Sequence, residues 1–242
     1  MISIFHEFLY RPLFNALIYL YQYFSFGDIG ISIILLTVLI RLALFPLFYK
    51  GAKSQAAMQR LMPKIKTIQK NLKHDREKQA QEMFKLYKEH KVSPFSGFGM
   101  LFIQLPILIA LYQVFLKGFS EGALNELYSF ISRPEFLNHY FLGVIDLTQR
   151  SLVLVVLAAA VQYWQAKLAM PNSKSTNKQD LTQMEIMSRQ MIFIGPILTV
   201  IFLYFFKLPS AVAIYWLTTS LFSVIQQIII NKKIKEDGTI KE

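Results

Sequence analysis

The sequence predicts an all-α integral membrane protein with five transmembrane helices, an N-terminal interfacial amphipathic helix and a cytoplasmic helical hairpin. Three observations support this fold class. Of the 242 residues, 54% are hydrophobic and 17% are charged, and the mean hydropathy is +0.37. Five apolar runs have about the 20-residue length that crosses a bilayer. The net charge of +11 is concentrated in one segment instead of being spread along the chain. This composition is typical of membrane proteins.

Residues 1–28 are expected to form the interfacial helix. Apolar residues recur at helical spacing from position 5 to position 20, and Glu7, Arg11 and Asn15 fall on another face. Four tyrosines in this segment suit the headgroup region of a bilayer. We therefore expect a helix that lies along the membrane surface. The alternative is a sixth, poorly formed span.

Residues 29–242 are expected to form one five-helix core. A proline at position 209 ends the fourth span and turns the chain, which predicts a tight antiparallel pair between the last two spans. The predicted spans cover about 29–49, 98–117, 150–168, 190–206 and 208–230.

Charge fixes the expected orientation of these spans. Between Lys50 and Lys91 there are twelve basic and four acidic residues, a net charge of +8, whereas the loop at 118–149 has four acidic residues and one arginine. Basic loops stay in the cytoplasm. We therefore expect the N-terminus outside and the 118–149 loop extracytoplasmic. The cytoplasmic segments are then the hairpin at 50–93, the loop at 169–189 and the short basic tail at 231–242.

Within the hairpin, apolar residues recur at helical spacing before and after a polar break at His74 and Asp75. Pro63 is expected in the first turn of a new helix. Methionines suit surfaces that accept varied apolar partners, although ordinary packing of the two helices explains them as well. The residues expected to make contacts from the hairpin are Met58, Met62, Met83, Lys64 and Lys66.

Arg41 lies inside the first predicted span, and no Asp or Glu occurs in any predicted span. A guanidinium in hydrocarbon costs roughly 2.5 kcal/mol or more unless it is paired. Taking 1.5 Å per residue, Arg41 lies about 12 Å from the cytoplasmic end of its span, which is too far for its side chain to reach the headgroups comfortably. Arg41 is therefore expected to face water or an anionic group of a substrate.

Side-chain amides occupy the cytoplasmic halves of the other spans, and the outer halves offer almost only aliphatic and aromatic side chains. Amides in lipid need hydrogen-bonding partners, so they should face one another or water. Together with Arg41 they predict a water-filled recess that opens to the cytoplasm and is sealed outside; for any one of them, a helix-packing hydrogen bond is the alternative. Thr37 lies one turn from Arg41, and Trp216 lies deep in the fifth span, either in the core or at the recess. The amides are Gln104, Gln162, Gln165, Gln190, Gln226 and Gln227.

A series of short motifs resembles the YidC-type membrane protein insertases. The first group runs from Ile29-Gly30-Ile31-Ser32 through Thr37, Arg41 and Pro46 to Met58-Gln59 and Pro63-Lys64. Each motif is weak alone, but their order and spacing together are specific from about residue 25 onward. The later motifs are Leu86-Tyr87-Lys88-Glu89, Ile103-Gln104, Pro106-Ile107, Ala110-Leu111-Tyr112, Leu208-Pro209, Tyr215-Trp216 and Gln226-Gln227.

The resemblance implies a five-helix core in a bacterial cytoplasmic (inner) membrane, with a hydrophilic groove open to the cytoplasm and to lipid. It places Arg41, Thr37 and Trp216 in the groove. It also places Gln165 there, with Gln162 as the alternate. We expect a short form of the family without the large extracytoplasmic domain of some relatives.

The expected function is insertion of nascent membrane proteins by a chaperone that is not an enzyme. No catalytic residue, metal or cofactor is expected: the predicted spans contain no Asp, Glu, His or Cys, and the sequence has no G-x-x-x-x-G-K-[ST] motif. Expected partners are nascent chains, lipids, the ribosome weakly through the short tail, and a Sec-type translocon, without specific DNA. The alternatives are a small-anion transporter that uses Arg41 and an assembly scaffold that does not insert proteins.

Overall fold

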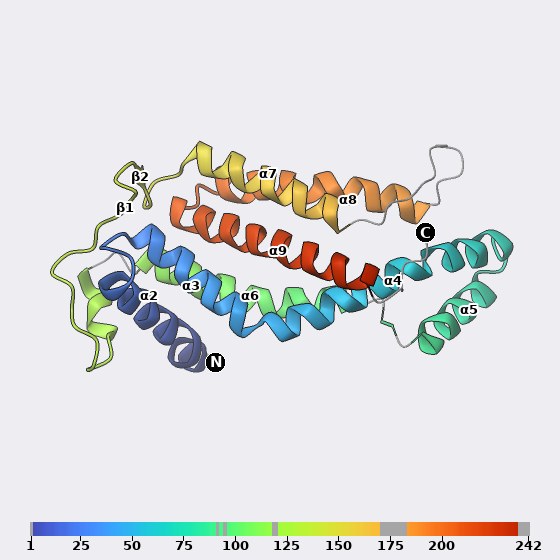
Figure 1. The fold of residues 1–242 in the computed structure, drawn as a ribbon, viewed down its shortest axis with the longest axis horizontal. Helices are drawn as coiled ribbons and strands as arrows, with labels where there is room; N and C mark the ends of the chain where they lie inside the picture. The colour runs from blue at the N-terminus through green and yellow to red at the C-terminus, as the bar shows by residue number, and fades with distance from the viewer. Residues whose placement is uncertain (1, 91, 94–95, 118–120, 170–182, 237–242) are drawn as a thin grey trace.

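The computed structural model describes residues 2–90, 92–93, 96–117, 121–169 and 183–236. Within these ranges the protein is an elongated helical bundle with one two-stranded sheet (Figure 1). A hairpin of helices projects from one end of the bundle, and the sheet lies at the other end. Parts of the predicted 169–189 loop and of the predicted 231–242 tail lie outside the described residues.

The N-terminal segment is a continuous helical rod made of α1 (Ile2–Phe5), the π-helical turn η1 (His6–Tyr10) and α2 (Arg11–Tyr23). It packs against α3 and α6. Phe14, Leu17 and Ile18 are buried against these helices. Whether the rod lies along the membrane surface stays a prediction.

Asn15, which was expected on another face than the apolar residues of this helix, is 1% exposed. Its amide donates to the Glu126 carbonyl at 3.1 Å, and its side-chain oxygen accepts from the Tyr128 backbone amide at 2.7 Å. Both partners belong to the segment after α6. Asn15 therefore fastens the N-terminal rod to a loop more than 110 residues away in the sequence.

The first predicted span is broken. Helix α3 (Ile29–Ala43) ends at Leu44, and α4 (Phe45–Asn71) continues after a 63° bend. Pro46 in the first turn of α4 explains the break, because it has no N–H to donate and its ring collides with the carbonyl four residues earlier. The predicted span at 29–49 thus consists of two helices with a bend between them, and its crossing of the membrane as one span stays a prediction.

The hairpin consists of α5 (Arg76–Glu89) and the part of α4 that packs against it. The turn between them ends at Asp75, whose carboxylate accepts from the Lys78 backbone amide at 3.0 Å and caps α5. This is the polar break that the sequence predicted. Pro63, by contrast, lies inside α4 and does not begin a helix, so that expectation was wrong.

The rest of the bundle contains α6 (Ser96–Lys117), α7 (Leu152–Leu168), α8 (Gln183–Val200) with the π-helical turn η4 (Ile201–Phe205), and α9 (Ser210–Glu236). Helix α7 packs against both α8 and α9, and α9 packs against α3. The chain turns between η4 and α9 at Lys207, which has a φ of 54°.

The end of the bundle away from the hairpin is closed by the segment between α6 and α7. It contains the 3-10 turn η2 (Glu121–Glu126) and the antiparallel strands β1 (Tyr140–Phe141) and β2 (Ile145–Asp146). The main apolar core lies in this half of the bundle. Representative buried residues are Ile33 of α3, Phe115 of α6, Val155 of α7 and Val212 of α9.

Among the described residues, Ser210–Lys232 is the one helix that is both long and apolar enough to cross a membrane. The bent pair of Ile29–Ala43 and Phe45–Gly51 would add a second if it acts as one span. Three further apolar helices are shorter, at Phe102–Leu116, Leu152–Leu168 and Ile192–Phe205. The all-helical character is confirmed, whereas the count of five spans stays a prediction.

Candidate functional site

A recess of about 240 Å³ lies in the half of the bundle next to the hairpin. Five helices contribute to its walls, and residues of α7 and α9 supply most of the lining. Polar and apolar side chains alternate around it. The lining residues are Arg41, Phe48, Gln162, Gln165, Ala166, Ala169, Gly195, Ser223, Gln226 and Gln227.

Among the described residues that line the recess, Arg41 is the one that is charged, and it is 7% exposed. None of the carboxylates in the described ranges forms an ion pair with it. Its guanidinium carbon instead lies 4.5 Å from the centre of the Phe48 ring, a cation–π contact. Phe48 follows the bend at Leu44, so the break in the first span brings an aromatic face over the cation.

The structure brings together several of the amides that the sequence singled out. Gln162, Gln165, Gln226 and Gln227 all line the recess with Arg41. Some of them also hold helices together, as the alternative interpretation expected. The Thr199 hydroxyl of α8 donates to the Gln162 side-chain oxygen of α7. Thr199 is fully buried, and no pattern in the sequence indicated it as the partner.

Gln104 lies elsewhere. Its amide donates to the Tyr215 hydroxyl, which links α6 to α9. Tyr215 is 3% exposed and lies close enough to Arg41 for the two groups to interact electrostatically. In the sequence, Tyr215 stood out only as part of the Tyr215-Trp216 motif. Gln104 and Tyr215 are therefore joined by a hydrogen bond, and neither is among the residues that line the recess.

Thr37 and Trp216 are not among the lining residues either. The Thr37 hydroxyl donates to the Ile33 carbonyl at 2.6 Å, four residues earlier in the same helix, and the side chain is buried. Trp216 is partly buried and packs against the main apolar core. A groove role for Thr37, Gln104 and Trp216 stays a prediction.

The expected hairpin residues divide into two kinds. Met58, Met62 and Met83 are partly buried and pack against the small core of the hairpin, so the structure fits ordinary packing for them. That core consists of Leu61, Ile65 and Leu86.

The two lysines lie outside this core. The Lys64 ammonium lies 3.0 Å from the His90 Nε2, and Lys66 is half-buried. The His90 Nδ1 lies 3.1 Å from the Leu86 carbonyl. A donor at Nδ1 leaves Nε2 as the acceptor for Lys64, so this pair joins the end of α5 to α4 when His90 is neutral.

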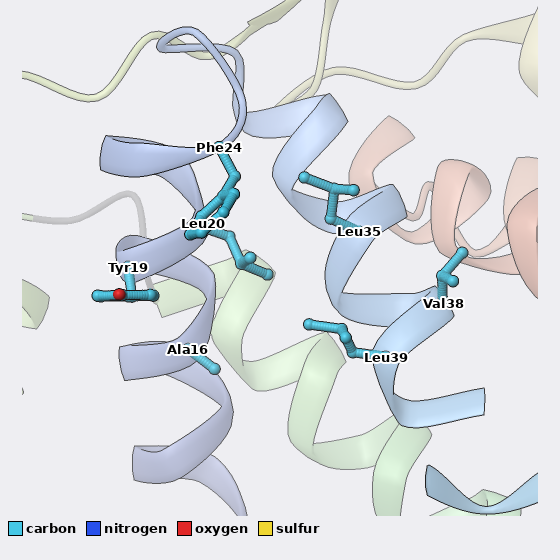
Figure 2. A pocket seen from close by; sticks show the side chains of 7 residues that line it. All are labelled: Ala16, Tyr19, Leu20, Phe24, Leu35, Val38 and Leu39. Carbon is cyan, nitrogen blue, oxygen red and sulfur yellow. The ribbon is translucent and has the colours of Figure 1, made fainter. Parts of the chain in front are cut away.

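A second hollow, of about 420 Å³, lies between α2 and α3 (Figure 2). Residues of both helices line it, and none of them is charged. They are Ala16, Tyr19, Leu20, Phe24, Leu35, Val38 and Leu39. This hollow lacks the groups that would bind a polar ligand. Within the part of the chain that the structure describes, no three His, Asp or Glu residues are grouped to hold a metal ion.

Comparison with known proteins agrees with the resemblance seen in the sequence. The family model described as the 60Kd inner membrane protein matches residues 19–237. The chain is 35% identical over 206 residues to the membrane protein insertase YidC of Clostridium tetani, covering 84% of this chain and 81% of that protein. It is 34% identical to the YidC insertase of Fusobacterium nucleatum, covering 86% and 88%.

Some relatives are much longer. The YidC insertase of Helicobacter pylori is 33% identical over 222 residues, which cover 92% of this chain and 36% of that protein. The match therefore spans nearly all of this chain and about a third of such relatives. The family model matches most of this chain, and the alignments with the Clostridium and Fusobacterium insertases cover most of both proteins. The chain therefore belongs to the YidC family, the family described as the 60Kd inner membrane protein.

Proposed function

We propose that this protein is a membrane protein insertase. It moves short polar segments of nascent membrane proteins across the bilayer through a hydrophilic groove open to the cytoplasm, and it releases their apolar spans into lipid. The observation that carries this proposal is the recess beside the hairpin. It contains a buried cation without a carboxylate partner among the described residues, together with four side-chain amides. The names of the relatives support the same activity.

The recess would lower the barrier to moving a polar segment. A carboxylate at the centre of a bilayer costs about 2.5–3.5 kcal/mol even on insertion scales. Arg41 and those recess amides that do not already bind another helix or a neighbouring side chain would replace part of the water that such a group loses, and the segment would then cross only the apolar half of the bundle. The cation–π contact with Phe48 would keep the guanidinium in place while the site is empty.

The driving force would come from the apolar span of the substrate. About twenty apolar residues at −0.3 to −0.6 kcal/mol each release roughly 6–12 kcal/mol on entering lipid. This exceeds the cost of moving a few polar residues, so no nucleotide hydrolysis or covalent step is required. The hairpin and its basic surface would meet the nascent chain first. The ribosome, a Sec-type translocon and lipids are further proposed partners.

The test is insertion into proteoliposomes of a single-span substrate whose translocated segment is either acidic or neutral. Arg41→Ala and Arg41→Glu should lower insertion of the acidic substrate by at least about tenfold, because a charge-assisted hydrogen bond contributes about 1.5–3 kcal/mol. Arg41→Lys should keep most of the activity. Unchanged insertion of the acidic substrate by Arg41→Glu would refute the electrostatic role. Equal insertion into liposomes that lack the protein would refute the insertase itself and favour a scaffold.

A further inference from the structure

The amides around the recess differ in what their side chains bind. The Gln162 oxygen accepts from Thr199, as described above. The Gln227 amide donates to the Asn231 side-chain oxygen at 2.9 Å, and Asn231 in turn donates to the Leu168 carbonyl at 3.2 Å. Gln227 therefore belongs to a link between α9 and the end of α7. These two glutamines already have structural partners.

Gln226 is different. It is 6% exposed, and its Nε2 atom is buried without an acceptor in the described part of the chain. A buried N–H group without an acceptor destabilises a fold, and native proteins keep few of them. The same residue lines the recess that contains Arg41. The lining of the recess thus includes both an amide donor without an acceptor and a guanidinium without a carboxylate partner in the described part of the chain.

Donors without acceptors define the ligand that would fit. A guanidinium has five N–H donors and no acceptor, whereas a carboxylate has only acceptors, at about four positions. A carboxylate could accept from Arg41 and from Gln226 at the same time. A neutral amide of the same shape has a single acceptor oxygen and no charge, so it would gain less from the guanidinium and could not match both donors with separate oxygens. The combination therefore favours Asp or Glu over Asn or Gln.

We propose that Gln226 is a specificity-determining residue that binds, together with Arg41, a carboxylate of the translocated segment. This inference rests on the proposed insertase function and refines it. It assigns to Gln226 the role of hydrogen-bonding the acidic side chain while Arg41 supplies the charge. Gln227, its neighbour in the sequence and in the recess, has no such role because its amide is engaged with Asn231.

The test compares insertion of two matched substrates whose translocated segments differ only by Glu→Gln and Asp→Asn exchanges. The readout is the ratio of acidic to neutral substrate inserted, because a purely structural defect lowers both. Gln226→Met, which keeps the volume and removes the donor, should lower this ratio about tenfold, the factor that one hydrogen bond to a charged group supplies. Gln226→Glu should lower it further through repulsion. Gln227→Met, the matched control, should leave the ratio at its wild-type value.

Arg41→Glu in the same assay separates the two proposals. A wild-type ratio for Gln226→Met, with a lowered ratio for Arg41→Glu, overturns the role of Gln226 and leaves the insertase proposal standing. Wild-type insertion of both substrates by Arg41→Glu overturns the groove function itself. An equal fall of the ratio in Gln226→Met and Gln227→Met also overturns the specific role of Gln226. If Gln226→Met inserts neither substrate, the ratio for Gln226→Leu decides, because leucine also removes the donor: a wild-type ratio overturns the proposal and a lowered ratio supports it.

Discussion

Replacing Gly30 with alanine would put a methyl group where Phe141 already lies. Gly30 is in the first turn of α3, and β1 crosses directly over it. A Cβ atom at this position would be 2.7 Å from Phe141 Cγ and 2.8 Å from Phe141 Cβ. Real carbon atoms do not approach so closely, so either the ring or the whole β-hairpin must move.

The size of the effect follows from three contributions. Alanine gains up to about 1 kcal/mol of helix propensity over glycine. Overpacking costs about 1–3 kcal/mol. If the β-hairpin lifts, the Asp28 carboxylate also loses the Leu142 backbone amide, which donates to it at 2.6 Å, and a charged hydrogen bond of this kind contributes about 1.5–3 kcal/mol. We expect a net loss of about 2 kcal/mol, or roughly 4–8 °C in Tm for a chain of this size.

Thermal unfolding in detergent micelles measures this loss. The set comprises wild type, Gly30→Ala, Phe141→Ala and the double variant. Gly122→Ala is the control, because a Cβ there would meet no atom within 4 Å. Removing the ring should relieve the clash, so the double variant should be more stable than the sum of the single effects allows. A Gly30→Ala protein as stable as wild type, or strictly additive effects, would refute the reasoning.

Two further predictions concern the segments outside the bundle. Ile65→Ala should open the α4–α5 hairpin, because Ile65 is 1% exposed and such a truncation costs about 2–5 kcal/mol. Limited proteolysis should then cut the hairpin faster, and cutting at the wild-type rate would contradict the prediction; Phe84→Ala, at a side chain that is 70% exposed, should leave the rate unchanged. The Thr148 hydroxyl donates to the Asp146 carboxylate at 2.7 Å and thereby lowers the pKa of that carboxyl below its usual value. A lowered folded-state pKa contributes stability that is present above the unfolded-state pKa and is lost as the pH falls through the folded-state pKa. Thr148→Ala removes the hydrogen bond that lowers the pKa of Asp146. This variant should therefore have a higher Asp146 pKa and should lose that stability at a higher pH. Carbon NMR of the Asp146 carboxyl measures this change, and an unmoved pKa would contradict it.

Much of the fold was readable from the sequence because hydropathy and charge act locally. The helices of the bundle and the hairpin lie close to the apolar runs and the basic segment that predicted them. The bend at Leu44 was missed although its cause was visible. Pro46 lies inside an apolar run that is long enough to cross a bilayer. The prediction followed the length of that run and did not allow for the backbone hydrogen bond that a proline cannot donate. Pro63 shows the reverse, since α4 tolerates a proline that was expected to begin a helix.

The candidate site was predictable only in part. The cost of burying Arg41 and the expected gathering of amides placed Gln162 and Gln165 near it, because a buried charge and buried amides need polar surroundings. Their partners were not predictable. Thr199 meets Gln162 only through the packing of α8 on α7, and Asn15 meets Glu126 across 111 residues. Periodicity describes one helix at a time and carries no information about which helices are neighbours.

The most direct test of the proposed mechanism asks from which side water reaches the recess. The chain contains no cysteine, so a single Ser223→Cys variant introduces one thiol into the wall beside Gln226. Ala158→Cys, on α7 in the apolar half and fully buried, is the matched control. A membrane-impermeant maleimide should label position 223 from the cytoplasmic side and not from the outside. A stalled nascent chain with an acidic segment should block that labelling, and position 158 should stay unlabelled throughout. Labelling of position 223 from the outer side, or no protection by the nascent chain, would contradict an inward-opening groove that receives the substrate.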